Sequence, residues 1–128
     1  HVKLREQLGL LSGPVEEFQK SAEAEHNAML SMLVDEGYLD ASALEDELAN
    51  ENEIIDALYR GLKGSPCKLM AASIVDAVGE KRTQNQPGTS NEYPNWRIPL
   101  ADGDGNVVPL EQLFDNTRLR EIAAIMRG

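Results

Sequence analysis

The apolar positions in the first half of the chain repeat at helical spacing. One apolar stripe runs along residues 14–36, with members three or four positions apart: Val15, Phe18, Ala22, Met29, Leu30, Leu33 and Val34. Pro14 suits a first helical position, and Gly37 suits the residue just after a helix end. The pattern predicts a helix over 14–36, preceded by a short amphipathic helix within residues 2–11.

A second helical region follows after Gly37. Ser42 and Glu45 have the spacing of a capping box, which indicates a helix that begins at Ser42. Asn50 and Glu53 repeat the spacing, so the helix is expected to break there and restart. The next apolar stripe consists of Ile54, Ile55, Leu58, Tyr59 and Leu62. We therefore expect residues 1–64 to be helical.

Residues 65–100 have a different pattern. The run from Cys67 to Ala72 is short and mainly apolar, which is typical of a buried strand, and residues 73–78 predict a helical turn that ends at Gly79. Residues 84–97 show neither helical nor strand periodicity. This segment, rich in Pro and Asn, is therefore predicted to be a loop.

The last region, residues 101–128, begins with a turn. Asp102, Asp104 and Asn106 match three ligand positions of a calcium-binding EF-hand loop, but Val107 stands where that loop needs glycine. A turn that joins two short extended segments, as in a small hairpin, is therefore favoured over a calcium site. Two short helices are expected after it, over 110–114 and 118–126.

These elements define the expected fold class. The chain is predicted to be mainly α, with one short strand and room for a small hairpin. At 128 residues it is long enough for one modest core, so we expect a single unit. The chain starts at His1 without methionine, which suggests a fragment or a processed protein.

Charge and cysteine content narrow the function classes. The net charge is −10, and residues 1–64 carry −9 of it, from 14 acidic and 5 basic side chains. An acidic surface repels phosphate backbones, which argues against nucleic acid as a partner. No apolar run is long enough for a membrane span. Cys67 has no partner for an internal disulfide, so we expect a cytoplasmic protein.

The loop at 84–97 carries the side chains best suited to binding. It combines the sole tryptophan with asparagines, a carboxylate and a guanidinium. Aromatic faces can stack on sugar rings, and these polar groups can bind sugar hydroxyls. The candidate substrate-binding residues are Asn85, Pro87, Gly88, Asn95, Trp96 and Arg97. A role for His26 as a metal ligand is disfavoured, because only carboxylates lie at helical spacing from it.

The same residues carry a family resemblance. Asn85-x-Pro-Gly-Thr followed by Glu92-Tyr-Pro-Asn-Trp-Arg and Pro-Leu resembles the C-terminal signature of bacterial 4-α-glucanotransferases. These enzymes are also called amylomaltases or disproportionating enzymes, and they form glycoside hydrolase family 77. Residues 2–10 resemble the segment after the family's His-Asp motif, and 65–78 resemble its last barrel strand with the following turn.

The resemblance implies the C-terminal segment of a (β/α)8 TIM barrel with its outer helices. Such an enzyme transfers α-1,4-glucan segments between maltodextrins by a retaining mechanism, without a cofactor or metal. By the family's order, the catalytic carboxylates lie outside this chain. We therefore expect no catalytic residue here and no activity of the chain alone. The implied partners are a maltooligosaccharide substrate and the rest of the parent catalytic domain.

The resemblance also implies roles for individual residues. Asn85 is expected to reach the glucan, and Pro87 with Gly88 to shape its turn. For Trp96 and Arg97 a structural role is favoured over sugar contact, with Trp96 as a core plug and Arg97 paired to Glu92. Asp76 is interpreted as structural rather than as a functional acid.

A different class of function stays open. The chain would then be a free-standing helical module that binds carbohydrate or protein without catalysis. Under the enzyme hypothesis, a lone barrel strand has no neighbour to pair with. Exposed strand edge and apolar surface would then favour self-association or rearrangement.

Overall fold

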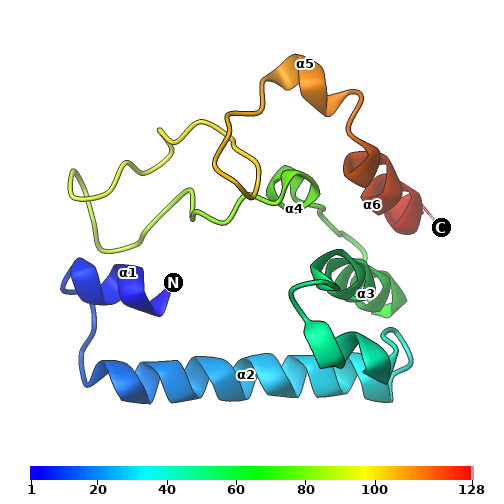
Figure 1. The fold of residues 1–128 in the computed structure, drawn as a ribbon, viewed down its shortest axis with the longest axis horizontal. Helices are drawn as coiled ribbons and strands as arrows, with labels where there is room; N and C mark the ends of the chain where they lie inside the picture. The colour runs from blue at the N-terminus through cyan, green and yellow to red at the C-terminus, as the bar shows by residue number, and fades with distance from the viewer. Residues whose placement is uncertain (128) are drawn as a thin grey trace. The chain divides into compact units, whose positions relative to one another are not determined.

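The computed structural model describes residues 1–127 and is mainly helical (Figure 1). In chain order the elements are α1 (Val2–Gln7), α2 (Val15–Asp35), the 3-10 helix η1 (Ala41–Asp46), α3 (Glu51–Gly64), α4 (Ile74–Val78), α5 (Leu110–Leu113) and α6 (Thr117–Arg127). The predictions of a helix over 14–36, a turn over 73–78 and two terminal helices are confirmed. The chain divides into two compact units, one containing 1–28 and 82–99 and the other 29–81 and the residues from Leu100 onward.

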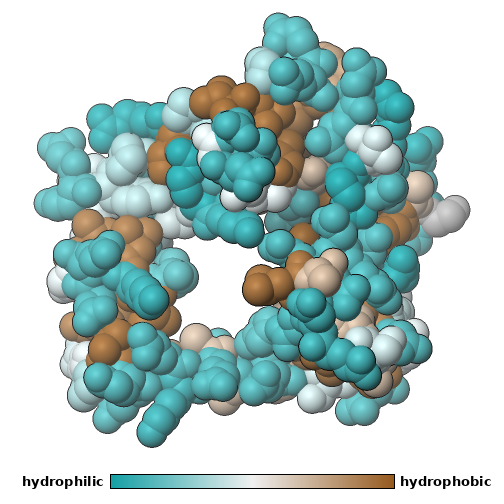
Figure 2. All heavy atoms as spheres, in the orientation of Figure 1, coloured by the Kyte–Doolittle hydropathy of each residue, from teal (hydrophilic) through white to brown (hydrophobic). Residues whose placement is uncertain are grey.

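Helix α2 changes character along its length. Residues 19–28 are all exposed, including Ala22 of the predicted stripe, whereas Leu30 and Leu33 are buried. Hydrophilic side chains cover most of the face of this helix seen in Figure 2. A helix segment that is polar all round gains no stability from burial. The helix is therefore anchored by its C-terminal end rather than by its middle.

The end of α2 packs into the first core of the second unit. Leu30 and Leu33 meet Leu39, Ala43, Ile54 and Ala57 from the following turn, η1 and α3. Gly37 has φ +75° just after the helix, a conformation that costs glycine nothing because it has no Cβ. The backbone N–H of Tyr38 then donates to the carbonyl of Leu33 at 2.9 Å. This turn directs the chain back over the core.

The prediction of a helix capped by Ser42 is wrong. Asp40 is the cap: its carboxylate accepts from the Ser42 backbone N–H at 2.9 Å and from the Ser42 hydroxyl at 2.6 Å. The element that follows is the short 3-10 helix η1. The expected break and restart near residue 50 is confirmed, but the Asn50 amide donates to the carbonyls of Ala43 and Asp46 instead of closing a capping box.

A second core joins three helices of the same unit. Tyr59, Ala77 and Ile122 are buried together, and apolar residues of α3 and α6 pack around them. Figure 1 shows α3 and α6 side by side. Arg118 of α6 pairs with Asp56 of α3 at 2.8 Å and with Glu121 at 2.6 Å. These charge-assisted hydrogen bonds raise the pKa of the Arg118 guanidinium and align the two helices.

The predicted buried strand at 67–72 does not form. Residues 66–74 are exposed, with Leu69 93% exposed, and residues 66–73 are irregular up to the start of α4. A strand is stable only when a neighbour accepts its backbone hydrogen bonds, and within residues 1–127 the β pairing consists of one isolated antiparallel bridge between Ala101 and Val107. That bridge is the predicted small hairpin, and Asp102 to Asn106 form its turn.

Candidate functional site

The candidate site is the loop of residues 83–97, which belongs to the first unit. Pro87 and Gly88 make its first turn, as the sequence predicts. Gly88 has φ +88°, and a Cβ built on it would lie 3.2 Å from Cδ2 of Leu10. The backbone conformation therefore favours glycine at this position, and a Cβ there would also need Leu10 to shift by a few tenths of an ångström.

Asn95 ties the two halves of the loop together. Its Oδ1 accepts from the backbone N–H of Gln86 at 2.7 Å. Its Nδ2 donates to Thr89 Oγ1 at 2.9 Å and to the Thr89 carbonyl at 3.3 Å. The side chain is thus occupied within the loop, although the sequence pattern predicts that it meets the substrate.

Two further contacts close the loop at its base. The Tyr93 hydroxyl donates to the carbonyl of Thr83 at 2.6 Å, and the backbone N–H of Trp96 donates to the carbonyl of Gln84 at 2.7 Å. The Thr89 hydroxyl donates to the Gln86 carbonyl at 2.7 Å. The loop is therefore held by hydrogen bonds from side to side, without helix or sheet.

Trp96 is the most unusual residue of the loop. Its φ is +59°, and among the described residues it is the only one other than glycine with positive φ. Its side chain is 75% exposed. The favoured expectation that Trp96 is a core plug is therefore wrong for this chain. A large aromatic face is instead open to solvent, which suits stacking on a flat apolar surface such as that of a sugar ring.

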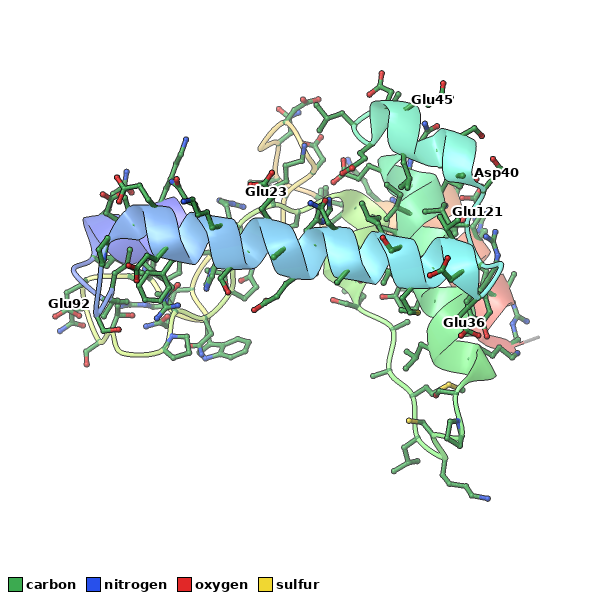
Figure 3. All side chains as sticks on the ribbon, turned by 90° about the horizontal axis from the view of Figure 1, so that it is seen from below. Glu23, Glu36, Asp40, Glu45, Glu92 and Glu121 are labelled. Carbon is green, nitrogen blue, oxygen red and sulfur yellow. The ribbon has the colours of Figure 1, made fainter. Side chains whose placement is uncertain are left out.

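Arg97 and Glu92 do not form the predicted ion pair. Both side chains are exposed, and the ion pairs between residues 1–127 do not join them. Glu92, labelled in Figure 3, instead accepts from the Ser90 backbone N–H at 2.7 Å, and this hydrogen bond lowers the pKa of its carboxyl. The guanidinium of Arg97 is therefore available to a ligand.

Asn85 lies at the turn with a half-buried side chain. Its backbone carbonyl accepts from the Thr83 hydroxyl at 2.7 Å. Within residues 1–127 its side-chain amide makes no hydrogen bond. An amide offers two donors and an acceptor, so Asn85 can still bind the hydroxyl groups of a ligand.

Sequence reasoning missed two glutamines of this loop. Gln86 is 2% exposed, and within residues 1–127 its Oε1 lacks a hydrogen-bond partner, as does the buried Nε2 of Gln84. Nothing in the local sequence distinguishes a buried glutamine from the exposed ones usual in loops. Buried polar atoms in folded proteins nearly always have a hydrogen-bond partner, so these two amides are candidates for a partner from outside residues 1–127.

Asp76 has a structural partner in the second unit. Its carboxylate accepts from the buried hydroxyl of Tyr59 at 2.5 Å, and that hydroxyl in turn accepts from the Ser73 backbone N–H at 2.9 Å. Burial, and then the carboxylate, raise the pKa of Tyr59. A shallow, largely apolar pocket of about 240 Å³ lies beside this pair, lined also by Ile55, Leu58 and Leu62.

The Asp102 turn uses its carboxylate internally. Asp102 accepts from the backbone N–H groups of Asp104 and Asn106 and from the Asn106 side chain, and these bonds lower its pKa. Groups of three or more His, Cys, Asp or Glu side chains placed to hold a metal are absent from residues 1–127. Nor does any helix in that range combine the length and apolar character of a membrane span.

Acidic side chains cover much of the helical surface. Figure 3 labels Glu23 on α2, Glu36 just after it and Glu45 on η1, all exposed. They are solvated helix faces.

Comparison with known proteins agrees with the signature in the loop. The glycoside hydrolase 77 family model, described as 4-alpha-glucanotransferase, matches residues 12–104. The 4-alpha-glucanotransferases of Mycobacterium tuberculosis and Mycobacterium bovis are 45% identical over 127 residues, which is 99% of this chain and 17% of theirs. That of Haemophilus influenzae is 29% identical over 122 residues.

A solved structure gives the same result in three dimensions. The crystal structure of amylomaltase from Corynebacterium glutamicum matches 98% of this chain and 19% of its own length, with a TM-score of 0.78 and 33% identity. The chain thus spans about a sixth of the length of the curated relatives it matches, at 17%.

Proposed function

Because this chain belongs to the 4-alpha-glucanotransferase family, glycoside hydrolase family 77, we propose that it is the C-terminal part of an enzyme that transfers α-1,4-glucan segments between maltodextrins. The observation that carries the proposal is the family match over residues 12–104, which contains the whole loop of residues 83–97. The exposed indole of Trp96 in that loop supports it further. We also propose a cytoplasmic location, on the strength of the lone Cys67.

The chain would supply the last strand and helix of a (β/α)8 barrel. Residues 67–72 have the apolar composition of a barrel strand but are exposed here, with Leu69 93% and Met70 38% exposed. In the intact domain a neighbouring strand would pair with this segment and cover its side chains. The rest of the parent catalytic domain is therefore the first partner of this chain.

The reaction is proposed to follow the retaining route. One carboxylate attacks the sugar and a second acts as acid and then as base, with the two about 5 Å apart. Both would come from the rest of the domain. Two acids of this chain have structural tasks instead, since Asp76 binds Tyr59 and Glu92 binds the Ser90 backbone.

The loop of residues 83–97 is proposed to contact the glucan. Asn85 and Arg97 have polar groups free to bind sugar hydroxyls, and Trp96 offers a face for a sugar ring. Pro87 and Gly88 shape the turn that carries Asn85. Asn95 belongs to the same site, although its hydrogen bonds run to Gln86 and Thr89.

The proposal is tested in the intact enzyme by measuring glucose release from maltotriose. Asn85→Ala should lower kcat/KM about tenfold, because a lost hydrogen bond of about 1.4 kcal/mol corresponds to that factor. Asn91→Ala is the matched control, because Asn91 is an exposed asparagine of the same loop. Equal activity of wild type and Asn85→Ala would remove Asn85 from the site.

The isolated chain provides the second arm of the test. It should release no glucose from maltotriose, because the catalytic carboxylates are proposed to lie elsewhere. Turnover by the pure chain would contradict the proposal. Tight maltooligosaccharide binding together with cooperative unfolding of the isolated chain would instead support the free-standing binding module.

A further inference from the structure

We infer that Asn95 is a positioning residue that acts through Trp96: its carboxamide ties the two halves of the loop of residues 83–97 together and so keeps the indole exposed on a left-handed backbone. The inference concerns the same loop as the proposed function. It rests on the proposed function in one respect, that the indole of Trp96 stacks on a sugar ring. The hydrogen bonds that carry it lie wholly within the first unit.

The backbone of Trp96 needs an external constraint. Side chains with a Cβ rarely adopt φ near +60°, since the Cβ then crowds the following carbonyl. Such conformations persist where neighbouring contacts allow no relaxation, and they cluster at functional sites. Burial cannot supply the constraint here, because Trp96 is 75% exposed. It must come from hydrogen bonds of the adjacent backbone.

The residue before Trp96 provides that constraint. Asn95 Oδ1 accepts from the Gln86 N–H at 2.7 Å, and its Nδ2 donates to Thr89 at 2.9 Å. These bonds fix the position of the Asn95 backbone against the first half of the loop. The Trp96 N–H then reaches the Gln84 carbonyl at 2.7 Å. The Arg97 N–H also donates to the Pro94 carbonyl at 3.0 Å, which closes a turn over Asn95 and Trp96. The bonds of the Asn95 side chain hold this turn against the first half of the loop, and together these contacts keep Trp96 in its left-handed conformation.

Two other features leave Asn95 as the central contact. The Tyr93 hydroxyl bond to Thr83 closes the base of the loop but lies three residues before Trp96. The Gly88 turn packs on Leu10 and supports only the first half. Among residues 1–127, Asn95 is the residue whose side chain bonds from the turn at 94–97 to both Gln86 and Thr89 of the first half.

The consequence for sugar binding is a preorganised surface. A tryptophan whose backbone is already held and whose indole is already exposed loses less conformational freedom when a ring stacks on it. A tryptophan on a relaxed loop would lose that freedom on binding. Asn95 would therefore contribute to affinity without touching the sugar.

The test uses the sole tryptophan of the 128-residue chain as the reporter. The indole band of the near-ultraviolet circular dichroism and the fluorescence anisotropy are measured without sugar. Asn95→Ala should lose the indole band and lower the anisotropy, while the far-ultraviolet helix signal is retained. Asn91→Ala, the same change at an exposed asparagine of this loop, should keep both indole signals.

A second variant guards against loss of folding. Asn95→Asp keeps an oxygen to accept from Gln86 but has no N–H to donate to Thr89, so it should lower both signals less than Asn95→Ala does. If Asn95→Ala also loses the far-ultraviolet helix signal, the indole signals of Asn95→Asp decide the test. Indole signals equal to wild type in the deciding variant would overturn the inference.

The inference and the proposed function fail separately. The indole signals without sugar test the role of Asn95 alone, whereas Asn85→Ala in the intact enzyme tests sugar contact. In the intact enzyme Asn95→Ala should raise KM for maltotriose more than it lowers kcat, with Asn95→Asp between it and wild type. Lost indole signals with an unchanged KM would overturn the link between the fixed indole and sugar binding.

Discussion

At the scale of single residues, Gly88 is a position of the loop where replacing glycine by a larger residue should destabilise the chain. Its φ of +88° costs a residue with a Cβ about 1–2 kcal/mol, and the Cβ would also press on Leu10 at 3.2 Å. Gly88→Ala should therefore lower the free energy of unfolding, measured in urea, by more than the backbone term alone.

Gly105→Ala is the control for the backbone term. Gly105 has φ +87°, and a Cβ there would meet nothing within 4 Å. The difference between the two variants measures the contact with Leu10. It should shrink when Leu10→Ala is added to Gly88→Ala, and equal losses in the two single variants would contradict the contact.

At the scale of secondary structure elements, Tyr59 joins α3 to α4. Tyr59→Phe removes the hydroxyl that binds Asp76 and the Ser73 N–H, so both groups lose a partner. Leaving partly buried groups unsatisfied should lower the free energy of unfolding by about 1–3 kcal/mol. Tyr38→Phe is the control, since within residues 1–127 the Tyr38 hydroxyl makes no hydrogen bond, and it should change stability little.

The same pair has a predictable pH dependence. The pKa of Tyr59 is raised above its ordinary value of about 10, first by burial and then by Asp76. The stabilisation is complete below about pH 10 and is lost as the pH rises through the folded-state pKa. The stability gap between wild type and Tyr59→Phe should therefore narrow in alkaline solution, and a gap that widens would contradict it.

At the scale of the whole molecule, the exposed segment of residues 66–74 should govern association. Leu69 and Met70 are apolar and exposed in the isolated chain, where the proposed barrel neighbours are missing. We expect the chain to self-associate in sedimentation experiments as its concentration rises. The double change Leu69→Ser with Met70→Ser should reduce this association.

Leu48→Ser separates this segment from exposed leucines in general. Leu48 is 85% exposed but lies between η1 and α3, away in sequence from the proposed strand. Its replacement should leave association nearly unchanged. Equal effects of the two changes would mean that association follows general hydrophobicity rather than the segment of residues 66–74.

The helical parts of the fold could be predicted because their signals are local. Apolar residues at spacings of three and four and the glycine at position 37 indicate α2 within a residue at each end. The cap of η1 could not be assigned, because Asp40 and Ser42 both suit an N-cap, and only the folded backbone shows which oxygen meets which N–H. The sequence pattern does not show which of two neighbouring N-cap candidates is used.

The candidate loop could be found from its composition, but its internal order could not. Asn85, Asn91 and Asn95 are the same residue type in the same loop. Of these three, Asn95 is the one whose side chain bonds to Gln86 and Thr89 across the loop. Likewise an apolar Trp96 is expected inside, whereas it is 75% exposed. These differences depend on which residues, up to ten positions apart in the chain, come into contact in the folded loop. The type of a side chain does not specify its contacts.

The sequence by itself determined the helices, their glycine ends, the Pro87-Gly88 turn and the family signature, because each depends on neighbours a few positions away. The tertiary structure alone decided that residues 67–72 stay unpaired in this chain and that Arg97 is not joined to Glu92. It also decided that Asn95 bonds across the loop. A strand, an ion pair and a cross-loop hydrogen bond each need a partner brought close by folding, and the free energy of such contacts depends on distance in space rather than along the chain.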